Sequence, residues 1–458
     1  MGIFWSYLFA SGQADTGDIV GTVTDGTGAP LANVKLTITR QNTSAFRETN
    51  TKRDGTYTVA SLSDGEYSIR AELESFKTQL RQGITVHLGR QEKVDLVLAV
   101  GDKTEIVTVQ EAPPMLRTTN AELGEVITND RIVNLPLNGR QFVDLTLLSD
   151  NIFKAPRGTR GSALAQTGTA VLVAGQRSGH NMYYLDGVSV TDQYFNHLVA
   201  SASPDAIGEF SIQKSIYPAE FGGKASATIS AVVKSGGNTI HGSGYEFLRN
   251  DVFDSRNFFD QDKPPFRQNQ FGGTLGGPLR KNQTFFFANY EGQRVKQSQT
   301  QTFSVPVASV RGGDFSGLPT IYDPLSSDLM GRRVPLSQNR IPSSRLDPVA
   351  NAFLPKLPYP NLPGQAQNYL ATPTLKNDIN QGLIRLDHRL STNDSLFAHL
   401  YVADFDTFQP LGTSLLNESL VPGFGYNLTT HTKSLALGET HVFSPSVVSE
   451  FRAAFLRV

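Results

Sequence analysis

The chain has 458 residues and no cysteine, and its 41 Lys and Arg residues nearly balance its 42 Asp and Glu residues. This length exceeds one compact domain and points to two or three, while the balanced charge offers no global field for nucleic acid. The lack of cysteine excludes disulfide frameworks, thiolate catalysis and cysteine zinc sites. The 41 glycines and 24 prolines predict many turns, as in a β-rich protein with long loops.

Residues 1–14 contain one short apolar run at positions 3–10 (IFWSYLFA). The run is far shorter than the roughly 18 apolar residues that a spanning helix needs. Small residues follow it up to Ala14, as at the end of a secretory signal peptide. We interpret the segment as a signal-peptide remnant and expect export. A start codon misassigned within a longer signal is the alternative, and it has the same implication.

Residues 18–100 form the first predicted domain. Runs such as GTVTD, VKLTIT and TYTVASL alternate apolar with polar side chains, which predicts a small antiparallel β-sandwich. The turn pairs between the runs are Asp25-Gly26, Asp54-Gly55 and Asp64-Gly65. The order G-x-V-x-D-x-x-G-x-P-L at 21–31, then D-G-x-Y at 54–57 and G-x-Y at 65–67, resembles the carboxypeptidase regulatory-like domain. That resemblance implies a binding or scaffolding module without catalytic residues of its own.

Residues 101–119 are predicted to be a linker. It carries one β-type run at 105–109 (EIVTV), followed by Pro113-Pro114, which cannot continue a hydrogen-bonded ladder. The run is either a separate recognition strand or the last strand of the preceding sandwich. The residue types alone leave both interpretations open.

Residues 120–241 form the next predicted domain, which contains the motif LPLNGR at 135–140. Around that motif, the segment 125–148 is predicted to begin with a polar turn and to continue with helical spacing at Phe142, Leu145 and Leu148. From position 173 the sequence VAGQRSGHNMYYLDGVSVTD packs short β-type runs between turns, with Asp186-Gly187 as a turn by its residue types.

These motifs resemble the plug domain of TonB-dependent outer-membrane receptors, and LPLNGR resembles their Oar-like branch. The residues that carry the resemblance are Leu135, Asn138, Gly139, Arg140, Arg177, Asp186, Gly187, Glu209, Gly222 and Gly223. The resemblance implies that plug charges such as Arg177 and Glu209 contact the inner wall of a barrel or one another. For each of them, a solvated surface charge is the alternative.

The resemblance also implies a role for the linker run as a TonB box. In the receptors such a box adds as an edge strand to a periplasmic energiser protein, and its backbone hydrogen bonds supply much of the affinity. The residues of the box are then Glu105, Ile106, Val107, Thr108 and Val109.

Residues 242–458 are predicted to be the start of a barrel wall. The predicted strands are 242–249, 266–276, 283–292, 381–390, 396–404, 431–441 and 447–458. Their connections alternate between long (250–265, 293–380, 405–430) and short (277–282, 391–394, 443–446). Outer-membrane barrels have this asymmetry, with tight periplasmic turns and long extracellular loops. A structureless connection as long as 293–380 also argues against an ordinary compact domain.

The last predicted strand shows the two faces that a barrel wall needs. Phe451 and Phe455 point one way, while Glu450 and Arg452 point the other, as lipid outside and water or plug inside require. Seven strands are an odd number, whereas bacterial single-chain barrels have an even one. An open wall leaves unpaired amides in hydrocarbon. We therefore predict that the chain is a fragment and that the remaining strands lie beyond residue 458.

No motif of enzyme chemistry is present. The sequence has no HExxH, GxSxG, Walker loop or dinucleotide fingerprint, so we expect no enzyme, no cofactor and no metal site. Asp186, Asp192 and Asp205 cluster loosely but form no recognisable calcium loop. Four histidines lack metal-ligand spacing and are expected at the surface or in turns: His180, His241, His388 and His399.

The sequence as a whole predicts a mainly β protein with a small antiparallel sandwich, an α+β plug and the first strands of an antiparallel transmembrane barrel. The indicated function is a TonB-dependent receptor of the bacterial outer membrane that takes up a ligand with energy from the inner membrane. The expected partners are the energiser, outer-membrane lipid and an extracellular glycan, peptide or siderophore, but no nucleic acid. The alternative is a secreted or surface-attached β-rich adhesin that binds carbohydrate.

Overall fold

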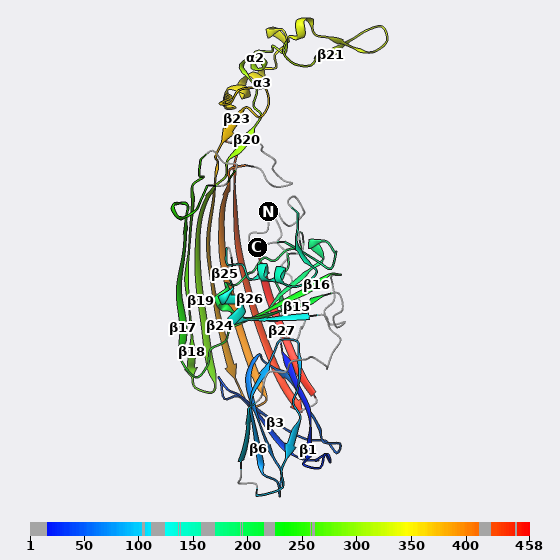
Figure 1. Ribbon diagram of the computed structural model, residues 1–458, viewed down its shortest axis with the longest axis vertical. Helices are drawn as coiled ribbons and strands as arrows, with labels where there is room; N and C mark the ends of the chain where they lie inside the picture. The colour runs from blue at the N-terminus through cyan, green and yellow to red at the C-terminus, as the bar shows by residue number, and fades with distance from the viewer. Residues whose placement is uncertain are drawn as a thin grey trace.

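The computed structural model has four connected parts along one long axis (Figure 1). A first domain (residues 16–110) and a central domain (124–240) precede a large sheet (241–298 and 374–457), from which an arm (299–373) projects. The described residues are 16–102, 106–110, 124–135, 137, 139–156, 170–192, 194, 196–214, 225–256, 258, 262–411, 423–444 and 447–458. None of the helices in these ranges is both long and apolar enough to cross a membrane.

The first domain is a two-layered β-structure with its own core. Its strands are β1 (Gly17–Asp25), β2 (Lys35–Arg40), β3 (Phe46–Asn50), β4 (Thr56–Leu62), β5 (Gly65–Glu72), β6 (Thr78–Val86), β7 (Gln91–Lys93), β8 (Leu96–Leu98) and β9 (Ile106–Gln110). One sheet has the order β3-β2-β5-β6-β9, and the other is built on β1. The period-2 alternation buries Ile19, Leu36 and Ile69 completely. The predicted antiparallel pairing holds for β1 to β6, whereas β7, β8 and β9 pair in parallel.

Gly21 of β1 lies where two backbones approach each other closely. A Cβ atom at this position would lie 1.9 Å from the carbonyl oxygen of Val94, which also accepts a 2.7 Å hydrogen bond from the Tyr57 hydroxyl. We expect Gly21→Ala to lower the free energy of unfolding of the first domain by about 1–3 kcal/mol or more, because the backbone must shift to relieve the clash. Thermal unfolding of the full-length protein measures this. Gly26→Ala is the control, because its Cβ would meet open space, and equal melting of both variants would contradict the prediction.

The central domain is an α+β unit around a five-stranded sheet of order β10-β15-β16-β13-β14. Its elements are β10 (Gly124–Thr128), α1 (Asn129–Asn134), η1 (Phe142–Leu148), β11 (Ile152–Lys154), β12 (Val171–Val173), η2 (Ser178–His180), β13 (Met182–Leu185), β14 (Val188–Ser189), η3 (Pro204–Ala206), β15 (Ile207–Lys214) and β16 (Ala227–Val233). The interior strands β15 and β16 are buried almost throughout. Both faces of this sheet are therefore covered by other parts of the chain.

Two details of the predicted segment 125–148 are wrong. Its start is not a polar turn but the strand β10, because Val126 and Ile127 complete a ladder with β15. The three positions with helical spacing lie in the short 3₁₀ helix η1, in which Phe142 and Leu145 are buried while Leu148 is 62% exposed. Leu148 ends the helix beyond the edge of the core, where periodicity no longer predicts burial.

The predicted turn at Asp186-Gly187 is confirmed. It joins β13 to β14 as a two-residue hairpin loop, with φ of 48° at Asp186 and 75° at Gly187. A positive φ at both central residues is typical of the type I′ hairpin turn and favours Asp or Asn followed by Gly. The turn leaves the Asp186 carboxylate only 2% exposed, close to the large sheet.

The large sheet has seven antiparallel strands in sequence order. They are β17 (His241–Asn250), β18 (Phe266–Arg280), β19 (Thr284–Ser298), β24 (Thr374–Arg389), β25 (Asp394–Gln409), β26 (Tyr426–Ser444) and β27 (Val447–Arg457). The predicted number of strands and the alternation of long and short connections are confirmed. The strands are longer than predicted, because paired polar residues such as Lys376 and Lys296 continue the backbone ladder where the apolar pattern has ended.

The arm between β19 and β24 is folded, so the expectation of a structureless connection is wrong. Its elements are β20 (Gln301–Phe303), α2 (Ala308–Arg311), β21 (Tyr322–Ser327), β22 (Arg333–Pro335), η5 (Ser337–Asn339), η6 (Ser343–Arg345), α3 (Pro348–Phe353), η7 (Leu354–Lys356) and β23 (Tyr369–Ala371). The side chain of Asn368 is fully buried and exchanges two hydrogen bonds with the backbone of Val305. The arm projects from the end of the large sheet opposite the first domain (Figure 1).

The polarity of the large sheet is inverted relative to that of a soluble protein. Large apolar side chains face outward and are 38–56% exposed: Phe271, Leu275, Tyr290, Ile384, Leu400, Val402, Leu435, Leu437, Phe451 and Phe455. Polar side chains on the same strands are buried on the inner face: Gln270, Asn289, Glu291, Gln293, Gln381, His399, Ser434 and Arg452. A contiguous apolar outer face with a polar inner face is the arrangement that lipid outside and a filled interior demand.

Candidate functional site: the interface of the central domain and the large sheet

The inner face of the large sheet packs against the central domain, and the two share one hydrophobic core (Figure 1). Phe287, Leu383 and Phe405 enter this core from the sheet, and Phe210 and Ile229 enter it from the central domain. Two clusters of buried charged residues cross the same interface. Because these clusters join parts of the chain that are far apart in sequence, the interface is the candidate functional site.

The first cluster is centred on Arg140 of the LPLNGR motif. The Arg140 Nε atom donates to the Glu291 carboxylate of β19 at 3.2 Å, and its Nη2 atom pairs with Asp205 of η3. The guanidinium also lies over the rings of Tyr245 and Phe247, 4.4 and 4.5 Å from their centroids. The side chains of Arg140 and Glu291 are 8% and 5% exposed. This one side chain therefore ties three segments together through charge-assisted bonds and ring contacts.

Neutral groups complete the hydrogen bonding of the Glu291 carboxylate. The Tyr245 hydroxyl donates to it at 2.8 Å and the Gln381 amide at 2.9 Å. Gln381 in turn accepts from the Tyr401 hydroxyl, which also donates to the backbone carbonyl of Ser201 in the central domain. A buried carboxylate with donors on both of its oxygens forms a specific contact, whereas loss of its cation leaves a costly unpaired charge.

The second cluster is centred on Asp186 at the hairpin turn. Its carboxylate accepts from the Val233 backbone N–H at 2.9 Å and from Arg385 Nη1 of β24 at 2.8 Å, and it lies 2.6 Å from His399 Nδ1 of β25. Burial acts to raise the pKa of the Asp186 carboxyl, but Arg385 and His399 outweigh burial and hold that pKa below its ordinary value. Asp387 pairs with the other side of the Arg385 guanidinium at 2.9 Å.

The predicted plug residues fall in different places. Arg140 and Asp186 occupy the two clusters, Leu135 packs against the shared core, and Gly139 and Gly187 have the positive φ that turns require. Arg177 is exposed, in agreement with the surface alternative for this residue. Four predicted residues lie outside the described part of the chain: Glu105, Asn138, Gly222 and Gly223.

The residues that the large sheet contributes to the two clusters were not predicted from the sequence. Glu291, Arg385 and His399 were not predicted as site residues, and the expectation that His399 lies at the surface or in a turn is wrong, because it is 1% exposed. A signal was present, since each of these three ionisable residues stands within a predicted strand. Buried charge in a strand requires a partner.

Glu209 of β15 faces the first domain rather than the large sheet. Its carboxylate accepts from the Leu88 backbone N–H and lies 2.9 Å from His87 Nδ1. The hydrogen bond to Glu209 raises the pKa of His87 more than burial lowers it, and the more distant charges of Glu92 and Arg90 oppose each other. The contact fastens the first domain to the central sheet.

We expect this contact to weaken as the pH rises. Because the folded pKa of His87 is raised, its stabilising contribution is complete below about pH 6.5 and is lost as the pH passes the raised pKa. The measurement is the equilibrium yield of a disulfide between Asn42→Cys and Gly237→Cys, whose Cβ atoms would lie 3.7 Å apart, as disulfides require. The same pair of cysteines with His87→Gln is measured beside it, because the disulfide yield also changes with pH through ionisation of the thiols. Identical pH profiles with and without this substitution would contradict the prediction.

The predicted TonB box lies in the first domain in part. Ile106 to Gln110 form β9, the edge strand that pairs in parallel with β6. This is the alternative interpretation of the run, the last strand of the sandwich. Ile106 and Val107 are 56% and 43% exposed, so β9 presents an unpaired edge of the kind that accepts another strand.

The described residues contain no group of three or more His, Asp or Glu side chains arranged to hold a metal ion. Asp186 and Asp205, which the sequence places in a loose acidic cluster, are instead paired with arginines. The chemistry available at the interface is therefore ionic and hydrogen-bonded attachment.

Comparisons with known proteins agree with this architecture. Residues 18–99 match the family model of the carboxypeptidase regulatory-like domain, and residues 232–458 match that of the outer membrane beta barrel domain. The TonB-dependent transporter Oar of Myxococcus xanthus is 26% identical over 303 residues, which is 64% of this chain and 28% of that protein. The chain is a homologue of TonB-dependent outer-membrane receptors. Its place is the bacterial outer membrane, and the relative Oar is named a transporter.

Two solved structures similar to this receptor homologue are outer-membrane proteins. The transporter YddB from Escherichia coli is 14% identical, with a TM-score of 0.43, over 70% of this chain and 37% of that one. The ferric enterobactin receptor PfeA from Pseudomonas aeruginosa is 10% identical, with a TM-score of 0.43, over 73% and 40%. The chain thus spans well under half of the length of each relative named here. Nothing in the comparisons supports the alternative of a secreted adhesin.

Proposed function

We propose that this chain belongs to a TonB-dependent receptor that takes up a ligand across the outer membrane with energy from the inner membrane. The observation that carries the proposal is the inverted polarity of the large sheet, whose buried inner face is joined to a separate domain by two ionic clusters. A soluble adhesin has no use for an apolar outer face of this extent. Homology to Oar supports the same class.

Within this proposal, the central domain (residues 124–240) is the plug. Its attachment to the large sheet is noncovalent and concentrated in the Arg140 and Asp186 clusters, so it holds firmly at rest and is released when those ion pairs part. The arm and the other long connections form the ligand side, because long loops of outer-membrane barrels are extracellular. The ligand is a glycan, a peptide or a siderophore, and we favour a fragment of a degraded polymer.

The experiment that tests the class uses the full-length protein. We expect it to require detergent for extraction and to migrate in gels in a heat-dependent manner, and we expect ligand uptake by cells to stop when the energiser is deleted. Extraction in plain buffer as a soluble monomer would overturn the proposal. If the protein requires detergent but uptake continues without the energiser, the barrel part of the proposal stands and the energy coupling is removed from it.

The run at 105–109 is proposed to bind the energiser as an added strand. The peptide of residues 102–112 should bind the energiser's periplasmic domain, and Val107→Pro should abolish that binding, because proline removes a ladder hydrogen bond. Binding to the peptide but not to the whole protein would mean that β9 must first leave its place beside β6. Failure of the peptide to bind would remove this assignment.

A further inference from the structure

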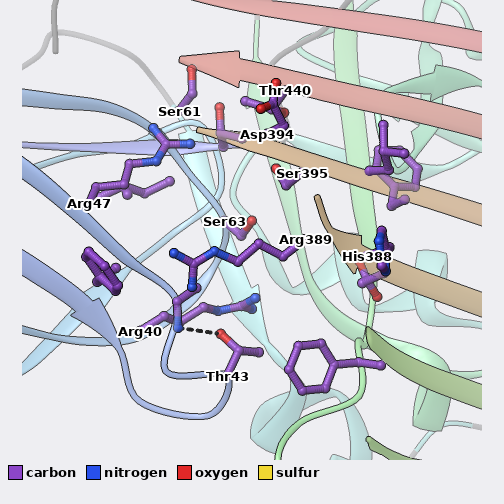
Figure 2. Close-up of a pocket in the computed structure, with 18 of the residues that line it drawn as sticks. Arg40, Thr43, Arg47, Ser61, Ser63, His388, Arg389, Asp394, Ser395 and Thr440 are labelled. Carbon is purple, nitrogen blue, oxygen red and sulfur yellow. Dashed lines mark hydrogen bonds between the residues drawn. The ribbon is translucent and has the colours of Figure 1, made fainter. Parts of the chain in front are cut away.

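A cavity of about 180 Å³ lies where the first domain, the central domain and the short-turn end of the large sheet meet (Figure 2). Five arginines line it, Arg40 and Arg47 from the first domain and Arg385, Arg389 and Arg452 from the large sheet. The lining includes the short turn at residues 391–394, and the short turns lie at the end of the sheet opposite the arm (Figure 1). The cavity is therefore separate from the proposed ligand side of the receptor.

Carboxylates accompany three of these arginines. Arg40 Nη2 lies 3.8 Å from Asp64, and Arg452 Nη2 lies 3.4 Å from Glu450, while Arg385 belongs to the Asp186 cluster. The Nε atoms of Arg40 and Arg452 are nevertheless buried without a hydrogen-bond partner among the described residues. Because these two Nε atoms are themselves covered by protein, they are not accessible to a ligand in the cavity, and the candidate donors are the other guanidinium N–H groups of the lining.

Arg47 and Arg389 have no carboxylate within 4.0 Å in the part of the chain that the structure describes. Arg47 Nη1 donates to the backbone carbonyl of Ala60 at 2.6 Å, and Arg389 Nε donates to that of Ser391 at 3.1 Å. The Arg389 guanidinium also lies 5.0 Å from the centre of the Phe46 ring in the first domain. Each side of the cavity thus contributes one arginine that forms no close ion pair among the described residues, although the more distant Glu450 carboxylate still acts on Arg47.

The rest of the lining combines hydroxyl groups with four aspartates, Asp64, Asp186, Asp387 and Asp394. The first three pair with arginines, and Asp394 pairs with Ser391 and His441. Figure 2 shows Arg389 reaching from the sheet toward Arg40, with Ser63 beside them and Arg47 next to Ser61. Further hydroxyl groups in the lining come from Thr43, Ser391, Ser395 and Thr440. Guanidinium groups bind carboxylate and phosphate oxygens through paired, charge-assisted hydrogen bonds, and hydroxyl groups complete such sites as donors.

We propose that this cavity is a binding site for a small ligand that carries carboxylate or phosphate groups, held by Arg47 and Arg389. Because these arginines belong to the first domain and to the large sheet, the bound anion fastens the two together. If the short turns are periplasmic, as in outer-membrane barrels, the ligand is a periplasmic anion distinct from any transported molecule. The site does not depend on the transport function, since binding is measured without uptake.

The test uses the full-length receptor purified in detergent, titrated calorimetrically with inorganic phosphate and, separately, with citrate. We expect saturable binding of at least one of them, and the stronger of the two identifies phosphate or carboxylate as the preferred group. Arg47→Gln and Arg389→Gln should each weaken binding by about tenfold or more, as expected for loss of a charge-assisted pair. Arg53→Gln is the control, because Arg53 is exposed on the same domain and does not line the cavity.

A second measurement reports the location of the ligand. The anion should increase the disulfide yield of the Asn42→Cys/Gly237→Cys pair, which spans the first domain and the segment before β17, and the increase should disappear in Arg389→Gln. The variants should melt like the parent protein in the absence of ligand, which separates binding from folding. Lack of saturable binding of both anions to the folded receptor would overturn the proposal. Binding that persists undiminished in both arginine variants would overturn it as well.

Discussion

Replacement of Arg385 by methionine is expected to destabilise the attachment of the central domain to the large sheet by about 3–5 kcal/mol, the usual cost of removing one partner from a buried ion pair. The Arg385 and Asp186 side chains are 12% and 2% exposed, so the ion pair is largely shielded from bulk water. Asp186 would keep only its bonds to Val233 and His399. The measurement is the urea midpoint for protease cleavage of the central domain in the full-length receptor.

The partner substitution gives this prediction its control. Asp186→Asn in the Arg385→Met background removes the unpaired charge, so the double variant should recover part of the lost stability. Arg333→Met in the arm replaces an exposed arginine and should have no measurable effect. An Arg385→Met receptor that is cleaved at the same urea concentration as the parent would show that the Asp186 cluster does not hold the central domain.

The order of the large sheet could be predicted from the sequence because its determinants are local. Each strand alternates between an outer and an inner face, and each short turn forces its two strands to pair. The ends of the strands could not be predicted, since a backbone ladder continues through polar residues such as Asp378 and Arg294. The fold of the arm could not be predicted for a related reason. It depends on the buried Asn368, whose side chain serves a backbone segment 63 residues away.

The two ionic clusters mark the limit of the sequence argument. Arg140 and Asp186 were predicted to matter because they lie in motifs, but their partners follow no local pattern. Arg385 is 199 residues from Asp186, and Glu291 is 151 residues from Arg140. Such pairs become visible only when the inner face of the sheet is placed against the central domain. A charged residue in the middle of a strand, like Glu291 or His399, is the one sequence feature that points to them.

Replacement of Arg140 by methionine is expected to release the central domain near LPLNGR, again at a cost of about 3–5 kcal/mol. Methionine keeps most of the contact with Tyr245 and Phe247 but leaves the Asp205 and Glu291 carboxylates without their shared cation. Arg140→Lys should destabilise the attachment about half as much as Arg140→Met does. A lysine ammonium group is a point charge and cannot bind both carboxylates while it stacks on the rings. The urea midpoint for protease cleavage measures both variants.

Arg131→Met is the matched control for this second prediction. Arg131 belongs to the same domain and pairs with Glu125 at 3.5 Å, but its side chain is 55% exposed, so its removal should cost at most about 1 kcal/mol. Equal losses of stability in Arg131→Met and Arg140→Met would mean that burial does not decide the strength of the Arg140 ion pairs. A central domain that stays attached in Arg140→Met and detaches in Arg385→Met would assign the attachment to the Asp186 cluster alone, and Arg140 would then serve the local fold of the motif.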